Sequence, residues 1–292
     1  MRVILTGASG RLGAVLCADL IATGHDVVAL GQDELDITRA AQVVAVTNRV
    51  RPQAIINCAA YNAVDAAESD RAAAFALNAH GPSLLAAAAD VHEALFVHFS
   101  SDFVFDGETR HQYTELDPTN PLSVYGASKL AGETAAGRAS RHYVLRVSSL
   151  FGGVGMNGHR ATVDHITDSL VGGIAVRAAV DRTVTPSYVP DVTRAMLAML
   201  ARGVPYGTYH CVNSTSTTWY DLGREIARQL RVDADIQPIR AADLNTIAPR
   251  PTRCALSNQK LASVGIVMPT WQSAIRAHLA VRHASVGAPC VR

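Results

Sequence analysis

The first thirty residues of the chain place a glycine-rich turn between an apolar run and a helix-like stretch. Residues 2–5 have the composition of a buried strand, residues 6–13 read TGASGRLG, and a helical pattern covers 11–23. Glycines let the backbone turn tightly and approach a phosphate, while a helix N-terminus offers unpaired N–H groups to an anion. A tight β-α turn without a ligand is the alternative interpretation. The segment thus predicts the opening unit of a dinucleotide-binding α/β fold.

Short apolar runs then alternate with amphipathic or alanine-rich stretches as far as residue 150. This order is typical of a Rossmann-type, doubly wound parallel sheet with helices on both faces. We therefore predict an α/β domain over residues 1–150 that binds NAD(P). Its expected strands are 2–5, 27–30, 54–58, 95–99 and 143–147, and its expected helices lie near 11–23, 40–50, 71–90 and 125–138.

The pattern changes after Phe151, where Gly152, Gly153, Gly155 and Gly158 follow closely on one another. Helices are predicted near 161–172, 190–202 and 219–231, and a strand near 207–212 is expected to return to the sheet. Irregular chain with prolines at 238, 249 and 251 is expected after the last helix. Residues 151–292 are thus predicted to form a smaller C-terminal region that binds mainly substrate.

The composition excludes several classes of function. A net charge of +1 with no basic run argues against binding to nucleic acid. Five widely spaced cysteines without a C-x-x-C motif predict neither a disulfide framework nor a zinc site, and no metal is expected. The cysteine pattern fits the reduced thiols of a cytoplasmic protein. No apolar run is long enough to cross a membrane, so no membrane partner is expected.

The spacing of the turn is G-x-x-G-x-x-G, and the acid that usually binds the adenosine ribose is missing after the second strand. Gly31 and Gln32 stand there, ahead of Asp33 and Glu34. NAD and NADP therefore both stay open. Arg11, inside the turn, could meet a 2′-phosphate, which favours NADP(H) slightly over NAD(H). A solvated helix residue is the alternative interpretation of Arg11.

Tyr125 and Lys129 lie four residues apart near the start of a predicted helix, so their side chains share one face. The reduction of a carbonyl needs a proton donor, and an ammonium near a phenol lowers its pKa by favouring the phenolate. The chain contains only two lysines, Lys129 and Lys260. The pair predicts acid/base chemistry on a carbonyl or an alcohol.

Ser101 ends a predicted strand at the carboxyl edge, where ligands bind in open α/β sheets. Its hydroxyl is the expected hydrogen-bond donor to the substrate oxygen. Ser100, in the same turn, is the alternative, and a strand-end serine with a purely structural role is also open. Ser101, Tyr125 and Lys129 form the predicted catalytic set.

These elements together resemble the extended short-chain dehydrogenase/reductases, and within them the dTDP-4-dehydrorhamnose reductase family is most similar. The similarity spans nearly the whole chain. It is carried by residues 34–38 (ELDIT), 56–70 (INCAAYNAVDAAESD), 100–107 (SSDFVFDG), 125–133 (YGASKLAGE) and 250–256 (RPTRCAL).

The resemblance implies NAD(P)H-dependent reduction of the 4-keto group of a nucleotide-activated deoxysugar, as in dTDP-rhamnose biosynthesis. It places Asp36 and Ile37 near the adenine and Asn78 in a supporting contact. The cofactor residues implied by the turn and by the resemblance are Gly7, Gly10, Arg11, Leu12, Gly13, Asp36, Ile37, Ala59, Ala60, Tyr61, Asn78, Tyr125 and Lys129. The implied substrate residues are Asn62, Val64, Ser101, Phe103, Tyr125 and Leu150.

The sugar pocket departs from the pattern of the family. Asn62, Phe103 and Leu150 stand where threonine, tyrosine and tryptophan are expected in rhamnose-forming members. A more apolar site and a substrate other than dTDP-4-dehydrorhamnose are therefore predicted. Two other functions stay open at this point: a sugar-nucleotide epimerase or dehydratase, and a non-catalytic subunit that resembles the regulatory subunit of methionine adenosyltransferase. The expected partner is a nucleotide sugar, and a homodimer is the assembly considered.

Overall fold

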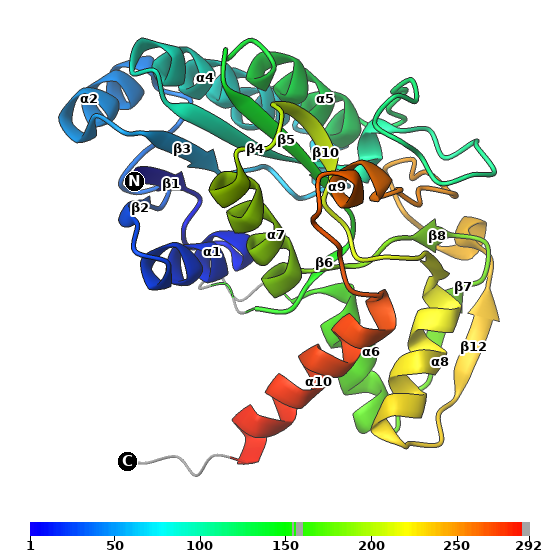
Figure 1. Ribbon diagram of the computed structural model, residues 1–292. Helices are drawn as coiled ribbons and strands as arrows, with labels where there is room; N and C mark the ends of the chain where they lie inside the picture. The colour runs from blue at the N-terminus through cyan, green and yellow to red at the C-terminus, as the bar shows by residue number, and fades with distance from the viewer. Residues whose placement is uncertain (154, 156–159, 288–292) are drawn as a thin grey trace.

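The structure is a computed structural model that describes residues 1–153, 155 and 160–287 of the 292-residue chain. Gly158 of the glycine-rich stretch and Cys290 lie outside the described residues. Two layers of helices enclose a parallel sheet, and a smaller group of elements lies below the sheet in Figure 1.

The sheet has six strands in the order β10-β5-β4-β3-β1-β2, and every neighbouring pair is parallel. The chain reverses its direction of winding between β1 and β3, which is where ligands bind in open α/β sheets. The predicted Rossmann-type fold is thus confirmed. The strands are β1 (Arg2–Thr6), β2 (Asp26–Leu30), β3 (Ala54–Asn57), β4 (Leu95–Ser101), β5 (His142–Val147) and β10 (Gly207–His210).

Both faces of the sheet are covered, which explains why its strands are continuous apolar runs. One face packs on α1 (Arg11–Ala22) and α7 (Val189–Arg202). The other face packs on α2 (Ala40–Val50), α4 (Gly81–Val91) and α5 (Val124–Ala136). The two layers are visible on opposite sides of the strands in Figure 1.

The single helix expected over 71–90 is instead divided into three parts. They are α3 (Arg71–Phe75), a π-helical turn η2 (Ala76–His80) and α4. Pro82, in the first turn of α4, has no main-chain N–H and cannot complete a regular α-helical ladder across the junction. The π-turn carries Asn78, whose side chain is fully buried.

The elements beyond residue 150 build a core of their own. Phe151, Tyr188 and Trp271 pack there with the helices α6, α8 and α10. β10 lies beyond residue 150 in the sequence but pairs with β5 in the large sheet. The division into two domains at residue 150 therefore stays a prediction. The elements are β6 (Leu150–Phe151), α6 (Thr162–Val171), β7 (Val176–Ala179), β8 (Thr183–Val184), β9 (Ser187–Tyr188), β11 (Thr217–Thr218), α8 (Trp219–Leu230), β12 (Ile236–Ile239), α9 (Gln259–Ser263) and α10 (Trp271–Gly287).

The prediction of irregular chain after residue 231 was wrong where β12, α9 and α10 form. β12 pairs in parallel with β7, and α10 buries Trp271, Ala274, Ile275 and Leu279 against the C-terminal core. The apolar stripe of α10 includes His278, which is buried beside Asp164, so the sequence pattern understates the buried face. Pro238 is tolerated in β12 because this strand forms one edge of a two-stranded sheet.

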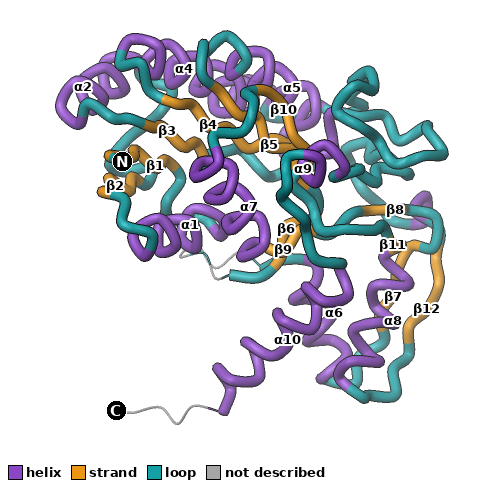
Figure 2. The backbone as a smooth tube through the Cα atoms, viewed as in Figure 1, coloured by secondary structure: helices purple, strands orange, loops and turns teal. Residues whose placement is uncertain are grey.

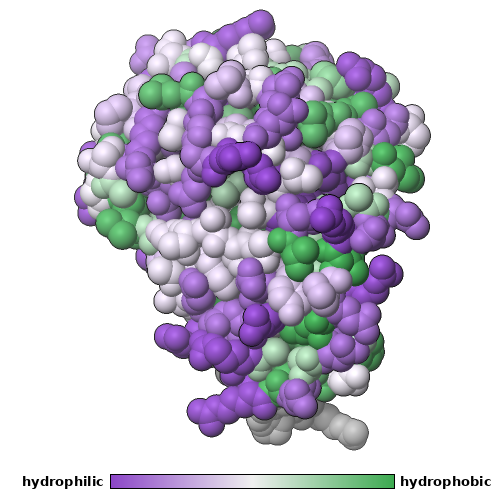
Figure 3. Space-filling view, turned by 90° about the vertical axis from the view of Figure 1, so that its right-hand side faces the viewer, coloured by the Kyte–Doolittle hydropathy of each residue, from purple (hydrophilic) through white to green (hydrophobic). Residues whose placement is uncertain are grey.

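Loops connect the sheet to the C-terminal elements (Figure 2). The loop after β4 reaches the segment before α9 through a bridge between Tyr113 and Leu256. Hydrophilic residues cover much of the face shown in Figure 3, with apolar residues in separate groups among them. None of the helices in the described part of the chain is long and apolar enough to cross a membrane.

Candidate active site

The glycine turn between β1 and α1 is packed too closely for side chains at two positions. Gly7 has φ +67°, and a Cβ there would lie 2.5 Å from the main-chain nitrogen of Ala59. A Cβ on Gly13 would lie 2.2 Å from the carbonyl oxygen of Gly7. Gly10 forms the N-cap of α1 with extended backbone. The turn therefore brings bare backbone and the N-terminus of α1 to the edge of the sheet.

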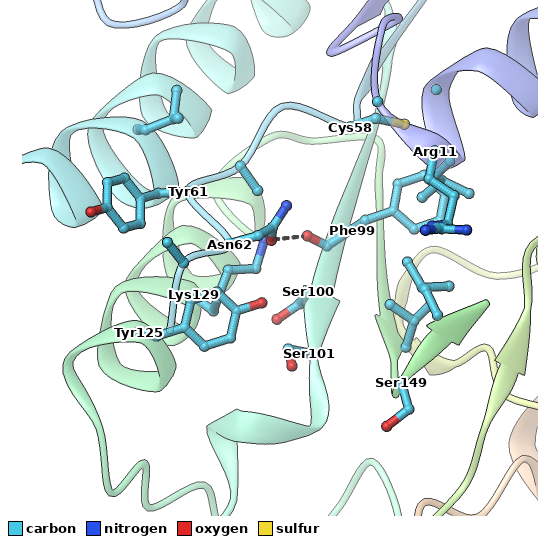
Figure 4. A pocket seen from close by; sticks show the side chains of 18 residues that line it. Arg11, Cys58, Tyr61, Asn62, Phe99, Ser100, Ser101, Tyr125, Lys129 and Ser149 are labelled. Carbon is cyan, nitrogen blue, oxygen red and sulfur yellow. Dashed lines mark hydrogen bonds between the residues drawn. The ribbon is translucent and has the colours of Figure 1, made fainter. Parts of the chain in front are cut away.

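A cavity of about 650 Å³ opens over this turn. It runs from the N-terminus of α1 to the carboxyl ends of β4 and β5, and Figure 4 shows the side chains around it. Many of the predicted cofactor and substrate residues line it together. They are Gly10, Arg11, Leu12, Gly13, Ala60, Tyr61, Asn62, Ser101, Tyr125, Lys129 and Leu150.

Other predicted cofactor residues lie behind or away from the cavity wall. Asn78 holds the main chain of Tyr61, since its Oδ1 accepts from the Tyr61 N–H at 2.8 Å and its Nδ2 donates to the Tyr61 carbonyl at 3.0 Å. Gly7 and Ala59 face each other beneath the turn. Ile37 is buried in the core against Gly81, and Asp36 bonds Thr38 and Arg39. The adenine contacts of Asp36 and Ile37 stay a prediction.

Arg11 connects the glycine turn to the C-terminal region. Its Nη1 donates to the Gly153 carbonyl at 2.9 Å and lies 3.3 Å from Oδ2 of Asp164 in α6. The Asp164 carboxylate also accepts from His278 and Arg282 at 3.0 Å each. The guanidinium that was considered for a 2′-phosphate is therefore paired with a carboxylate in this structure.

Tyr125 and Lys129 point from the first turns of α5 into the site (Figure 4). Ser123 is the N-cap residue of α5, and its hydroxyl oxygen accepts from the Gly126 N–H. Both side chains are buried, and the Lys129 ammonium donates to the carbonyl of Phe99 in β4 at 2.6 Å. Burial lowers the pKa of Lys129 to about 8, which leaves a large charged fraction at neutral pH.

The expected lowering of the Tyr125 pKa was wrong for this structure. Burial raises the pKa of Tyr125 to about 12, because the phenolate would lose its hydration, while a hydrogen bond with Ser101 opposes this effect. The ammonium of Lys129 is engaged with Phe99 instead. A phenol with this pKa keeps its proton at neutral pH, and the protonated form is the one that can serve as an acid in a reduction.

Ser101 lies at the end of β4, where the strand passes into the short helix η3 (Asp102–Val104). Its hydroxyl oxygen accepts from the Phe103 N–H at 3.2 Å and lies 2.9 Å from Oδ1 of Asp102. The alternative, Ser100, lines only the cavity over the glycine turn. Ser101, in contrast, lines both this cavity and a second one.

A second cavity of about 400 Å³ shares Ser101, Tyr125 and Ser149 with the first. Of the predicted substrate residues, Val64 and Phe103 line it, and the Phe103 ring meets the Tyr125 ring edge-on with centroids 5.5 Å apart. Asn62 and Leu150 line the first cavity only. Their assignment to the substrate stays a prediction, and their position favours contact with the cofactor.

Sequence reasoning missed the charged residues of the second cavity. Arg177 belongs to β7, Arg182 follows it, and Arg250 comes from the segment after η4 (Ala241–Asp243). Arg250 donates to both carboxylate oxygens of Asp65 at 2.8 Å. Arg177 and Arg182 stand outside the runs that resembled the family, so no local pattern pointed to these two arginines.

Four of the five cysteines are described, and all four are free thiols. Cys58 lines the first cavity, and burial raises its pKa, so its thiol is the protonated form at neutral pH. Within the described ranges, no three His, Cys, Asp or Glu side chains are placed to hold a metal ion.

Comparison with known proteins finds similar reductases that act on nucleotide-linked sugars. The chain is 38% identical over 280 residues to a probable dTDP-4,6-dihydroxy-2-methyloxan-3-one 4-ketoreductase of Streptomyces antibioticus, with 94% of each chain covered. It is 32% identical over 294 residues to a dTDP-4-dehydrorhamnose reductase of Burkholderia thailandensis, covering 94% of this chain and 97% of the relative.

Two solved structures of relatives superpose on nearly the full length of this chain. A dTDP-4-dehydrorhamnose reductase of Clostridium acetobutylicum superposes with a TM-score of 0.91 at 31% identity, covering 97% of this chain and all of that one. The Bacillus anthracis reductase, solved in complex with NADP, gives a TM-score of 0.90 at 31% identity and covers 96% and 99%. A family model for the RmlD substrate binding domain matches residues 1–283. The chain therefore belongs to the RmlD family of extended short-chain dehydrogenase/reductases, a family of NAD(P)H-dependent oxidoreductases.

Proposed function

We propose that this protein reduces the 4-keto group of a nucleotide-activated deoxysugar with NAD(P)H. The observation that carries the proposal is that Ser101 and Tyr125 line two cavities at once. One cavity lies over a glycine turn at a helix N-terminus, and the other is lined by arginines. A hydride donor and a phosphorylated carbonyl compound would thus meet at the same two hydroxyl groups.

The first cavity fits a dinucleotide. At Gly13 the backbone packs so closely on Gly7 that a Cβ would not fit. The N–H groups at the start of α1 can therefore bind a pyrophosphate without a side chain between them. Gly10, Arg11, Leu12 and Gly13 would hold that pyrophosphate. When bound, the cofactor supplies the hydride.

The residues of the chain supply the proton and the alignment. Tyr125, protonated at neutral pH, gives its phenolic proton to the carbonyl oxygen as it becomes an alcohol. Ser101 donates a hydrogen bond to the same oxygen and stabilises the negative charge that develops there. Lys129 holds the carbonyl of Phe99 and thereby the end of β4 beside the phenol.

The arginines favour a nucleotide sugar over a free sugar. Arg177 and Arg182 line the second cavity, where guanidinium groups can pair with the oxygens of a diphosphate. Trp219 lines the same cavity and offers an aromatic face to a nucleobase. The relatives with dTDP in their names fit this arrangement.

For the sugar, we propose a 4-keto-6-deoxy substrate with fewer hydroxyl groups than dTDP-4-dehydrorhamnose. Phe103 and Val64 make one wall of the second cavity apolar, and a buried sugar hydroxyl without a partner costs about 1–3 kcal/mol. The name of the Streptomyces antibioticus relative describes a methyl-substituted ring ketone with two hydroxyl groups, one fewer than 4-dehydrorhamnose carries.

For the cofactor, we propose NADP(H) over NAD(H). The support for this proposal is that the Bacillus anthracis relative was solved in complex with NADP. Calorimetric affinities for NADPH and NADH decide this point. An affinity for NADH equal to or greater than that for NADPH would contradict it.

The deciding experiment measures the oxidation of NADPH and NADH with dTDP-, UDP- and GDP-linked 4-keto-6-deoxy sugars, with and without the 2-hydroxyl. Turnover with at least one of them is expected, with the highest kcat/KM for a sugar that lacks this hydroxyl. Absence of turnover with the whole panel would refute a 4-ketoreductase. A preference for dTDP-4-dehydrorhamnose would refute the finer proposal alone.

A substitution at Phe103 tests the apolar wall directly. Phe103→Tyr should shift kcat/KM towards the more hydroxylated sugar by roughly 5- to 150-fold, which corresponds to one regained hydrogen bond of about 1–3 kcal/mol. Phe75→Tyr is the matched control, because Phe75 lines neither cavity. Equal selectivity in Phe103→Tyr and wild type would remove Phe103 from substrate selection.

A further inference from the structure

Asp102 is a buried residue whose carboxyl group contacts the Ser101 hydroxyl. Its exposed fraction is 4%. Its Oδ1 lies 2.9 Å from the hydroxyl oxygen of Ser101, and its Oδ2 accepts from the hydroxyl of Ser148 at 2.8 Å. Both contacts are with neutral groups. Asp102 is also among the residues that line the second cavity.

The charged and titratable groups around Asp102 do not form an ion pair with it. Arg182 faces it from the segment after β7, but its guanidinium lies over the Phe103 ring, and no salt bridge to Asp102 occurs among the described residues. Tyr125 faces it from α5, and Cys254 donates through its Sγ to the main-chain oxygen of Asp102 at 3.0 Å. Burying a carboxylate without an ion pair is costly, which shifts the equilibrium of Asp102 towards the neutral acid. Burial accordingly raises the pKa of Asp102.

The protonation state of Asp102 decides what the Ser101 hydroxyl can do, because a serine has a single proton to donate. If Asp102 is ionised, it can only accept, and the proton of Ser101 points to Oδ1. Ser101 then has no donor left for a substrate oxygen. If Asp102 is neutral, its own O–H donates to the Ser101 oxygen, and the Ser101 proton is released towards the cavity.

We propose that Asp102 acts as a neutral acid that positions the Ser101 hydroxyl to donate to the substrate carbonyl. This inference rests on the proposed ketoreductase function. Asp102 is a positioning residue, since it acts through Ser101. Ser148 fixes the second carboxyl oxygen, so the acid proton is directed to the oxygen that faces Ser101.

Asp102→Asn tests this role because a side-chain amide reproduces the neutral acid. Its NH₂ group can donate to Ser101 while its oxygen accepts from Ser148. We expect kcat within about threefold of wild type at neutral pH, since the hydrogen bond of Ser101 to the substrate is kept. A loss of about 10²-fold, the usual effect of removing one such donor, with unchanged cofactor affinity and Tm, would overturn the proposal.

Infrared spectroscopy reads the protonation state without any turnover. The carbonyl stretch of a buried, protonated carboxylic acid should be present in wild type at neutral pH and absent in Asp102→Asn. Asp106→Asn is the matched control, because Asp106 lies on the same loop, lines neither cavity and has its pKa lowered by hydrogen bonds from Tyr113 and the Glu108 N–H. The band should persist in that control. Its absence from wild type would overturn the proposal.

The two readouts separate this inference from the proposed function. Wild-type protein that turns over no keto sugar would refute the function, while the infrared band would still report whether Asp102 is neutral. Wild-type turnover together with an inactive Asp102→Asn variant would leave the function standing and refute the role of Asp102.

Discussion

Replacing Gly13 with alanine tests whether the turn after β1 is shaped for a bound phosphate. The new Cβ would lie 2.2 Å from the Gly7 carbonyl oxygen and 2.9 Å from the Cα of Ala8, so both neighbours are main chain. The Cβ and the Gly7 oxygen must separate by at least about 0.8 Å to reach 3.0 Å, the shortest tolerable contact. Gly7 itself packs on Ala59, which prevents the turn from moving back as a unit.

Overpacking of this kind costs roughly 1–3 kcal/mol of stability, or about 2–4 °C in Tm for each kcal/mol in a protein of this size. The displaced N–H groups should also weaken NADPH binding by at least about tenfold, which corresponds to ~1.4 kcal/mol. Urea unfolding and calorimetric titration measure the two effects.

Gly137→Ala is the control for the Gly13 variant. Gly137 has φ −65°, and a Cβ there would meet nothing closer than 3.4 Å, so both stability and affinity should stay near wild type. A Gly13→Ala protein with wild-type Tm and wild-type NADPH affinity would refute the reasoning, because the turn would then have to tolerate a shift that the packing forbids.

Three further outcomes follow from the same structure. Tyr125→Phe should lower kcat by at least ~10²-fold with little change in NADPH affinity, and near-normal turnover would remove Tyr125 from the mechanism. Lys129→Met should lose turnover and cofactor affinity together, and unchanged affinity by calorimetry would contradict the second half. Asp65 has its pKa lowered to about 2, chiefly by Arg250, so the pair stabilises the fold above the unfolded pKa of about 4 and loses this effect as the pH falls towards 2. Asp65→Asn should therefore flatten the pH dependence of urea unfolding between about pH 4 and 2, and an unchanged dependence would show that the pair contributes nothing.

The strands and helices around the sheet could be predicted because each depends on residues close together in the chain. β3, for example, is buried on both faces, and its apolar run is visible without knowledge of its neighbours. The pairing of Tyr125 with Lys129 likewise follows from the helical repeat alone. α10 was missed because its buried face includes His278, whose burial depends on Asp164, more than a hundred residues away.

The residues of the candidate site likewise fall into those that could be predicted from the sequence and those that only the structure revealed. The glycine turn, Ser101 and the Tyr125/Lys129 pair were found from local patterns, and family resemblance supplied Asn78 and Phe103. The arginines of the second cavity come from segments that meet only in the folded chain. The family resemblance also supplied Asn62 and Leu150, and the structure shows that they line the first cavity.

The sequence by itself determined that this chain forms a Rossmann-type sheet with a phosphate-binding turn and a tyrosine–lysine pair, because periodicity, turn chemistry and i,i+4 spacing are properties of neighbouring residues. Only the tertiary structure decided that Ser101 and Tyr125 lie between two cavities, that Arg11 pairs with Asp164, and that Asp102 is buried behind Ser101. Burial and hydrogen bonding set the protonation states of these groups, and both depend on segments that come together only when the chain folds.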